Sequence, residues 1–214
     1  MKLVLADDHR ITRELLRRVS TSELGHEVVA EAADGFQALE SIGDLRPDLV
    51  LLDLQLPRLD GFGVIEEVRR WPRRPRIIVL SALCNAYTVY RVERLPVEGF
   101  LDKHTATVEA LREAVEAVDK GRRYFSEEFH RVRAARRADP WAFDKVLSDR
   151  EQTVLALIGV WLTDREIAAR LGLEPCTAEK HRFNIQRKLD LRTKTELVRY
   201  ASRQGFRQFG ACGT

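Results

Sequence analysis

Acidic, hydroxyl and ammonium side chains stand at the ends of apolar runs in the first half of this sequence. They are Asp7, Asp8, Asp53, Ser81 and Lys103. If they meet in one crevice, the three carboxylates repel one another unless a divalent cation lies among them, and a small set of carboxylate oxygens favours Mg²⁺. A lysine and a hydroxyl facing the same cation would complete a phosphoryl-transfer site, in which a carboxylate oxygen attacks in line.

The apolar runs that carry these residues are typical of buried strands. Their Val, Ile and Leu residues do not alternate with polar ones, which indicates parallel strands covered on both faces. The segments between them have helical spacing. Strand–helix alternation predicts a doubly wound α/β domain with a five-stranded parallel sheet, whose sites lie at the carboxyl ends of strands. The five predicted strands are 2–8, 27–33, 47–56, 75–83 and 99–103.

Taken singly, each of these polar residues has an ordinary structural interpretation. An aspartate at a strand end usually caps a helix or faces solvent, and a lysine after a strand is usually surface charge. The prediction of a phosphoryl-transfer site therefore rests on finding all of these residue types together, at the ends of four strands.

Four segments resemble the receiver domain of bacterial response regulators. They are ADDH at 6–9, LLDLQLPRLDGFGV at 51–64, LSAL at 80–83 and GFLDK at 99–103. The resemblance covers residues 1–120 and implies a flavodoxin-like fold. It also implies that Asp53 accepts a phosphoryl group from a phosphohistidine on a sensor histidine kinase.

The same resemblance implies roles for the neighbouring residues. Asp8 and Asp53, with Asp7 partly through water and the backbone carbonyl of Gln55, would hold Mg²⁺.

Ser81 and Lys103 would bind the phosphoryl oxygens, and Phe100 would be the aromatic switch. A phosphate on Asp53 adds charge and acceptor oxygens. The Ser81 hydroxyl reaches it only by moving, and this movement frees space behind the fourth strand for the Phe100 ring. Because phenylalanine has no hydroxyl, the switching would depend on packing alone.

The charge of the chain is divided unevenly. The net charge is +3, but residues 1–118 carry −4 and residues 119–214 carry +7, so we expect the second half to meet a polyanion. The 44% of hydrophobic residues is enough for folded cores. No signal peptide or membrane-length apolar run is present, and the three cysteines have no metal-ligand spacing, which predicts a cytoplasmic protein without zinc or membrane contact.

Residues 121–144 are rich in arginine and have no sheet pattern, so we interpret them as a linker. They contain a predicted helix near 126–137, which Asp139 and Pro140 would end. The arginines would either face solvent or contact DNA.

Residues 145–214 predict a second, all-α domain of four short helices. Three capping boxes begin helices. The boxes pair Ser148 with Glu151, Thr163 with Glu166 and Thr193 with Glu196. Gly172 would end the second helix, and the turn LEPC leads to a basic third helix over 177–190. Two helices joined by a tight turn, the second of them basic, form a helix-turn-helix.

The third helix of this domain has two faces. One face should pack into the core of the domain, because its residues follow one another at +3, +4 and +4 spacing. These residues are Ala178, His181, Ile185 and Leu189. The opposite face carries Glu179, Lys180, Arg182, Phe183, Gln186 and Arg187. We expect base contacts from Glu179, Lys180 and Phe183. Phosphate contacts are expected from Arg182, Arg187 and Lys188, and from Thr177 at the positive end of the helix.

Residues 145–203 are similar to the LuxR-type domain of NarL/FixJ regulators. Three positions depart from the family pattern: Trp161 stands where glycine usually ends the first helix, Ala178 replaces valine, and Glu179 replaces a basic residue. In this family the last helix forms the dimer on DNA. Its residues here, Leu197, Val198, Tyr200 and Ala201, would form that patch or pack only within the domain.

These patterns together predict a two-domain transcription regulator, not a turnover enzyme. On phosphorylation of Asp53 the receiver would either dimerise or release its hold on the recognition helix. The protein would then act as a homodimer on two half-sites of double-stranded DNA. Three alternatives remain open at this point: a phosphorylation-independent regulator, a protein-binding adaptor, and an aspartyl-phosphate hydrolase. The hydrolase motif usually has a second Asp where Gln55 stands.

Overall fold

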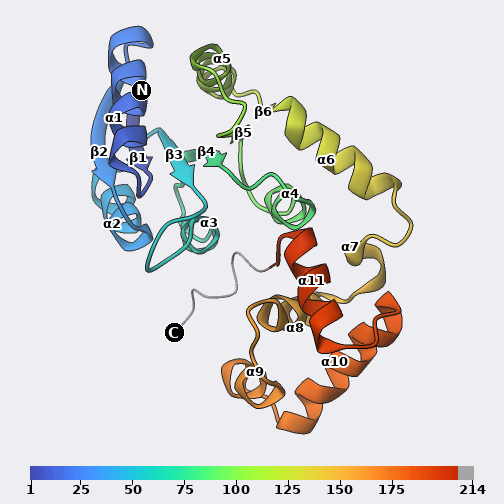
Figure 1. Ribbon diagram of the computed structural model, residues 1–214. Helices are drawn as coiled ribbons and strands as arrows, with labels where there is room; N and C mark the ends of the chain where they lie inside the picture. Colours follow the sequence, from blue (N-terminus) through green and yellow to red (C-terminus); the bar gives the residue numbers. More distant parts are fainter. Residues whose placement is uncertain (207–214) are drawn as a thin grey trace. The chain divides into compact units, whose positions relative to one another are not determined.

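The computed structural model describes residues 1–206 (Figure 1). Within this range the chain divides into two compact units. The first comprises Met1–Cys84 and Arg91–Arg131, and the second comprises Asn85–Tyr90 and the chain from Val132 onward. Residues 207–214, which end the predicted second domain and include Cys212, lie outside the described residues.

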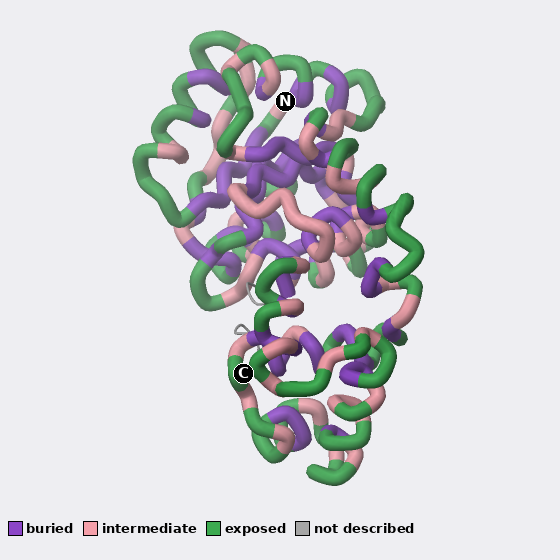
Figure 2. Tube along the Cα trace, turned by 45° about the vertical axis from the view of Figure 1, so that its right-hand side comes forward, coloured by how far each residue is buried: buried purple, intermediate pink, exposed green. Residues whose placement is uncertain are grey.

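A parallel sheet with the order β2-β1-β3-β4-β5-β6 forms the centre of the first unit. Its strands are β1 (Lys2–Ala6), β2 (Glu27–Ala32), β3 (Leu49–Asp53), β4 (Arg76–Ser81), β5 (Gly99–Asp102) and β6 (Tyr124–Phe125). Every residue of β3 is buried, and Figure 2 shows the strands as the buried centre of this unit. Burial on both faces explains the unbroken apolar runs, and the predicted doubly wound fold is confirmed.

Helices cover both faces of this sheet (Figure 1). On one face Leu16 of α1 and Val115 of α5 belong to one apolar cluster with β1, β3 and β4. Helices α2 and α3 lie on the other face. The elements are α1 (Arg10–Arg18), the short π-helix η1 (Val19–Glu23), α2 (Gly35–Leu45), α3 (Gly61–Val68) and α5 (Val108–Asp119). The division between the two units falls within α4 (Ala86–Glu93).

The sheet has a sixth strand where the sequence predicted only a linker. Tyr124 and Phe125 pair in parallel with Gly99 and Phe100 of β5. A strand of two residues is too short to show a hydrophobic period, so the sequence pattern could not predict it. It is followed by α6 (Glu127–Ala138), close to the predicted linker helix.

The second unit contains the four predicted helices of the helix-turn-helix domain. They are α8 (Asp149–Gly159), α9 (Asp164–Leu171), α10 (Pro175–Leu189) and α11 (Lys194–Gln204), preceded by the short α7 (Phe143–Val146). All three predicted capping boxes are present, and Gly172 ends α9 in the left-handed region at φ 63°. Helix α10 begins at Pro175, two residues before the predicted start, because proline suits the first helical position, where no backbone N–H is needed.

None of the described helices is both long and apolar enough to span a membrane.

Candidate functional site

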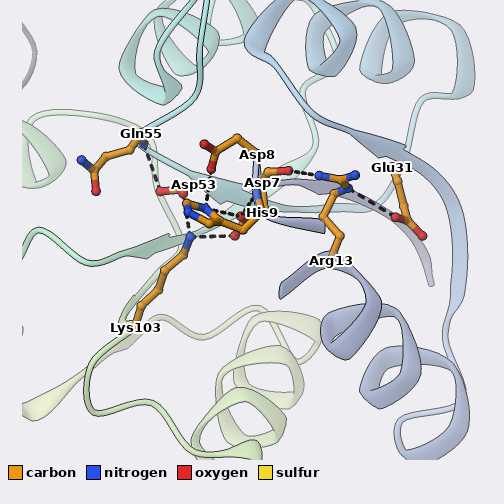
Figure 3. A network of polar contacts seen from close by, with 8 residues as sticks. All are labelled: Asp7, Asp8, His9, Arg13, Glu31, Asp53, Gln55 and Lys103. Carbon is orange, nitrogen blue, oxygen red and sulfur yellow. Dashed lines mark hydrogen bonds and ion pairs between the residues drawn. The ribbon is translucent and has the colours of Figure 1, made fainter. Parts of the chain in front are cut away.

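The carboxyl ends of β1, β3 and β5 bring Asp7, Asp53 and Lys103 together, as parallel strands ending at one edge must (Figure 3). The ammonium nitrogen of Lys103 lies 2.6 Å from Asp53 Oδ2 and 2.6 Å from Asp7 Oδ2. Both carboxylates are almost fully buried, at 1% exposure for Asp7 and 2% for Asp53. The predicted acidic and ammonium groups therefore form one cluster.

The first residue of α3, Gly61, lies very close to the backbone of Asp53. A Cβ atom at Gly61 would collide with the Asp53 carbonyl oxygen, so only glycine allows this close approach. Asp60 caps α3 through a hydrogen bond from the Gly63 N–H. The backbone N–H of Gln55 donates to Asp53 Oδ1 at 3.0 Å and orients that carboxylate.

Burial and the neighbouring charged groups shift the pKa values of Asp53 and Lys103 in opposite directions. Burial raises the pKa of Asp53, although hydrogen bonds from Gln55 and Lys103 oppose that shift. Burial alone would lower the pKa of Lys103, but its hydrogen bonds to Asp53 and Asp7 outweigh that effect and raise it. The lysine is therefore held as an ammonium between two carboxylates.

Within the described residues, the ligand atoms of Asp7, Asp8, His9 and Asp53 all lie within 4.8 Å of one another. One ammonium faces three carboxylates, so the cluster keeps excess negative charge. Oxygen ligands of this kind suit a hard cation, and the cluster is compatible with Mg²⁺.

Two neighbours of the cluster had no role in the sequence interpretation. His9 Nδ1 lies 2.6 Å from Asp8 Oδ1, and its side chain is mostly exposed. Arg13 donates to the Asp7 carbonyl at 2.6 Å and is 3.4 Å from Glu31, so it fixes the end of β1 (Figure 3). The sequence could have indicated His9, because it directly follows the acidic pair Asp7 and Asp8. It could not have indicated Arg13, because only the folded helix α1 brings that side chain to the end of β1.

Ser81 and Phe100 are fully buried. The Ser81 hydroxyl oxygen accepts a hydrogen bond from the Leu83 N–H at 3.0 Å. The Phe100 ring packs against Phe129 of α6, with ring centroids 5.1 Å apart. Gln55 is exposed, and Figure 3 shows its side chain directed away from the carboxylates.

In the second unit, α10 exposes all three residues expected to contact bases. Glu179, Lys180 and Phe183 are exposed, and Thr177 near the start of the helix is half-buried. Arg187 is exposed as well.

Two of the residues expected to contact phosphates have partners within the domain. The Arg182 guanidinium binds Asp164 at 3.0 Å, and Lys188 Nζ lies 2.7 Å from Glu151 Oε2. Gln186 was predicted on the exposed face, and this is wrong. It is buried at 8% exposure and donates to the Arg192 carbonyl at 2.9 Å.

The predicted core face of α10 is only partly enclosed. Ala178 and Ile185 are buried, whereas His181 and Leu189 are half-buried.

Trp161 has a positive φ of 68°, in the region that normally favours glycine. This explains why glycine is usual at that position.

The apolar residues of the last helix pack within the domain, and Tyr200 remains only partly buried there. Leu197 and Val198 are buried in the core of the second unit, beside Ala201.

Comparisons with known proteins agree with this geometry. Residues 3–116 match the response regulator receiver domain, and residues 145–201 match the luxR family of bacterial regulatory proteins. The oxygen regulatory protein NreC of Staphylococcus aureus is 32% identical over 98% of this chain and 100% of its own length.

Solved structures give the same result. The response regulator RcsB of Salmonella typhimurium is 27% identical, with a TM-score of 0.63 over 94% of this chain and 98% of its own. A complex of RcsB with DNA has a TM-score of 0.65 over 95% and 98% of the two chains, also at 27% identity. The chain therefore belongs to the NarL/FixJ-type response regulators, the phosphorylation-regulated transcription regulators of two-component systems that join a receiver to a LuxR-type helix-turn-helix domain.

Proposed function

We propose that Asp53 is the phosphoacceptor of this regulator and that a phosphohistidine of a sensor histidine kinase is the donor. The observation that carries the proposal is the position of Asp53, which is buried, hydrogen-bonded to Lys103 and within 4.8 Å of the ligand atoms of Asp7 and Asp8. In the transfer, the N–P bond of the donor breaks as a carboxylate oxygen of Asp53 forms an O–P bond.

The neighbouring groups would share the charge of the transferred phosphoryl group. Asp8, Asp53 and the backbone carbonyl of Gln55, with Asp7 partly through water, would hold Mg²⁺, and the cation would supply positive charge beside the phosphoryl oxygens. Lys103 turns its ammonium from the free carboxylates to a phosphoryl oxygen.

Ser81 and Phe100 would carry the signal away from the site. The Ser81 hydroxyl leaves the Leu83 N–H and donates to a phosphoryl oxygen. The Phe100 ring then moves toward the vacated space.

The second part of the proposal concerns DNA. Glu179, Lys180 and Phe183 read base edges, while Thr177 and Arg187 meet phosphates. Arg182 and Lys188 reach phosphates only by leaving Asp164 and Glu151. We assign residues 1–120 to the receiver, 121–144 to the linker and 145–214 to the DNA-binding domain.

Phosphorylation would favour a homodimer that binds two half-sites about one helical turn apart. A related structure contains two RcsB dimers bound to two parallel DNAs, which supports a dimer as the DNA-bound form. The protein would work in the cytoplasm, where kinase and DNA are both accessible.

Mass spectrometry after incubation with a small phosphoryl donor and Mg²⁺ tests the phosphoacceptor. We expect a single phosphoryl group on the wild type and on Asp44→Ala, which removes an exposed carboxylate of α2, but none on Asp53→Ala. Equal modification of Asp53→Ala would overturn the assignment. Steady release of phosphate over many turnovers would instead favour the hydrolase alternative.

A further inference from the structure

A hollow of about 670 Å³ opens in the first unit, lined by residues from 42–48 and 71–76. It lies at the amino ends of the strands, because Asp48 precedes β3 and Arg76 begins β4. Asp53 ends β3, so about 13 Å of strand separates the hollow from the phosphoacceptor site. The hollow is therefore a different place from the site described above, and its volume is in the range of pockets for small molecules.

Positive charge is concentrated in this hollow. Arg46, Arg73, Arg74 and Arg76 line it, against one carboxylate, that of Asp48. Because guanidinium groups only donate hydrogen bonds and are planar forks, they match phosphate and carboxylate groups.

Two of the four arginines are already engaged. Arg74 binds the Glu98 carboxylate at 2.8 Å, and Arg76 donates to the Val118 carbonyl at 2.6 Å. The side chains of Arg46 and Arg73 make no hydrogen bond or ion pair with any residue in the range 1–206. The hollow thus has two guanidinium groups that are available to an anion.

The backbone of Arg46 is an independent indication. It caps α2 at φ 45° and ψ 60°, in the left-handed region where helices usually end with glycine or asparagine. This conformation is costly for a residue with a long side chain, and such positions occur more often at functional sites than elsewhere.

The walls of the hollow are stiff and partly aromatic. Pro47, Pro72 and Pro75 contribute to its lining. Because their φ angles are fixed, the lining would lose little conformational entropy when a ligand binds. Trp71 lines it as well, with its ring edge 3.6 Å from where a Cβ atom at Gly43 would lie. A flat ring can stack on an indole, and guanidinium groups can hold phosphates beside it.

We propose that this hollow binds a small anion that joins a flat ring to phosphate groups, which is the chemistry of a nucleotide. The ring stacks on Trp71, and Arg46 and Arg73 bind the phosphates. The Asp48 carboxylate accepts a hydrogen bond from a ribose hydroxyl or a ring amino group.

Calorimetric titration of the full chain with ATP tests this site, in EDTA so that the acidic cluster holds no metal. Arg46→Ala/Arg73→Ala should weaken binding by about tenfold or more, because each substitution removes a charge-assisted hydrogen bond. The matched control is Arg69→Ala/Arg70→Ala, which removes the same charge from exposed arginines paired with Glu66 and Glu67. It should weaken binding less than twofold.

Pyrophosphate binding and the Trp71→Ala variant distinguish the contribution of the ring to binding from that of the phosphates. Pyrophosphate should bind the wild type more weakly than ATP, and Trp71→Ala should reduce that difference while its thermal melt shows a folded protein. The proposal is overturned if ATP does not bind at millimolar concentration, if both arginine pairs matter equally, or if pyrophosphate binds as tightly as ATP.

Discussion

Lys103 and Asp53 form an ion pair across the edge of the sheet, with the ammonium nitrogen 2.6 Å from the carboxylate oxygen, although 50 residues separate them in the chain. The same ammonium is 2.6 Å from Asp7. It is the positive group that holds the ends of β1 and β3 together. The pair therefore links the stability of the receiver to the state of its phosphoacceptor.

Removing this ammonium should destabilise the receiver in a way that Mg²⁺ reverses. Lys103→Met leaves buried carboxylates uncompensated, and we expect a loss of about 3 kcal/mol in metal-free buffer. Because the cation then supplies the missing charge, millimolar Mg²⁺ should reduce the loss. Urea unfolding with and without Mg²⁺ measures both effects. Lys120→Met, at an exposed pair with Glu116, should cost under about 0.5 kcal/mol. A loss that is insensitive to Mg²⁺ would count against the account.

Phe129 should contribute more to stability than any exposed aromatic residue. It is 1% exposed and packs on Phe100 and Phe125, with ring centroids 5.1 and 4.7 Å away. Phe129→Ala should cost about 3–5 kcal/mol, because it leaves a cavity beside Phe100. Phe183→Ala, at a position 56% exposed, should change the unfolding free energy by about 0.5 kcal/mol or less. Similar urea midpoints for the two variants would show that Phe129 is not part of the core.

The cations of α10 should differ in what they do. Arg187→Ala should weaken DNA binding and reduce the slope of log affinity against log salt by about one, because it removes a phosphate contact. Lys180→Ala should weaken binding to the preferred sequence more than to other sequences, because it removes a base contact. Arg182→Ala should instead lower the melting temperature, because Asp164 loses its partner. Filter binding at several salt concentrations and thermal melts separate the two effects. Equal salt slopes for Arg187→Ala and the wild type would remove Arg187 from the phosphate contacts.

The prediction for α10 shows what a sequence can and cannot reveal. Its amphipathic spacing indicated a helix and an exposed basic face. The partners of Arg182 and Lys188 lie on α9 and α8, so spacing along one helix could not reveal them. Gln186 was misplaced for the same reason, because its acceptor is the Arg192 carbonyl beyond the helix end.

The receiver was more predictable than this helix. Its strands are buried on both faces, so their apolar runs mark them clearly, and Asp7, Asp53 and Lys103 meet because parallel strands end at one edge. The two-residue strand β6 and the hollow between residues 42–48 and 71–76 have no such periodic signal.

Glu151 should make the DNA-binding domain less stable in acid. Burial alone would raise its pKa, but hydrogen bonds from Lys188 and Ser148 outweigh this and lower it. A lowered pKa in the folded state means that the stabilisation is complete above the unfolded pKa and is lost as pH falls through the folded pKa. Glu151→Gln should therefore shrink the fall in unfolding free energy between neutral and acidic pH. Glu174→Gln, at a cap without a side-chain hydrogen bond, should not. An unchanged pH profile in Glu151→Gln would refute this role.

The two described cysteines should differ in reactivity. Burial raises the pKa of Cys84 to about 12, whereas Cys176 is exposed near the start of α10. In a Cys212→Ser background, iodoacetamide at neutral pH should label Cys176 first and leave Cys84 largely unmodified, because the thiolate is the reactive form. Peptide mass mapping after timed quenching measures this order. Unfolded protein should label at both positions, and early labelling of Cys84 in the folded protein would contradict its raised pKa.

A phosphoryl group on Asp53 should increase the affinity of the protein for DNA. DNA fragments selected from a random pool provide the ligand, and fluorescence anisotropy measures the dissociation constant with and without a small phosphoryl donor and Mg²⁺. We expect tighter binding by the modified wild type and no change for Asp53→Ala. Equal affinity of the modified and unmodified wild type would contradict it.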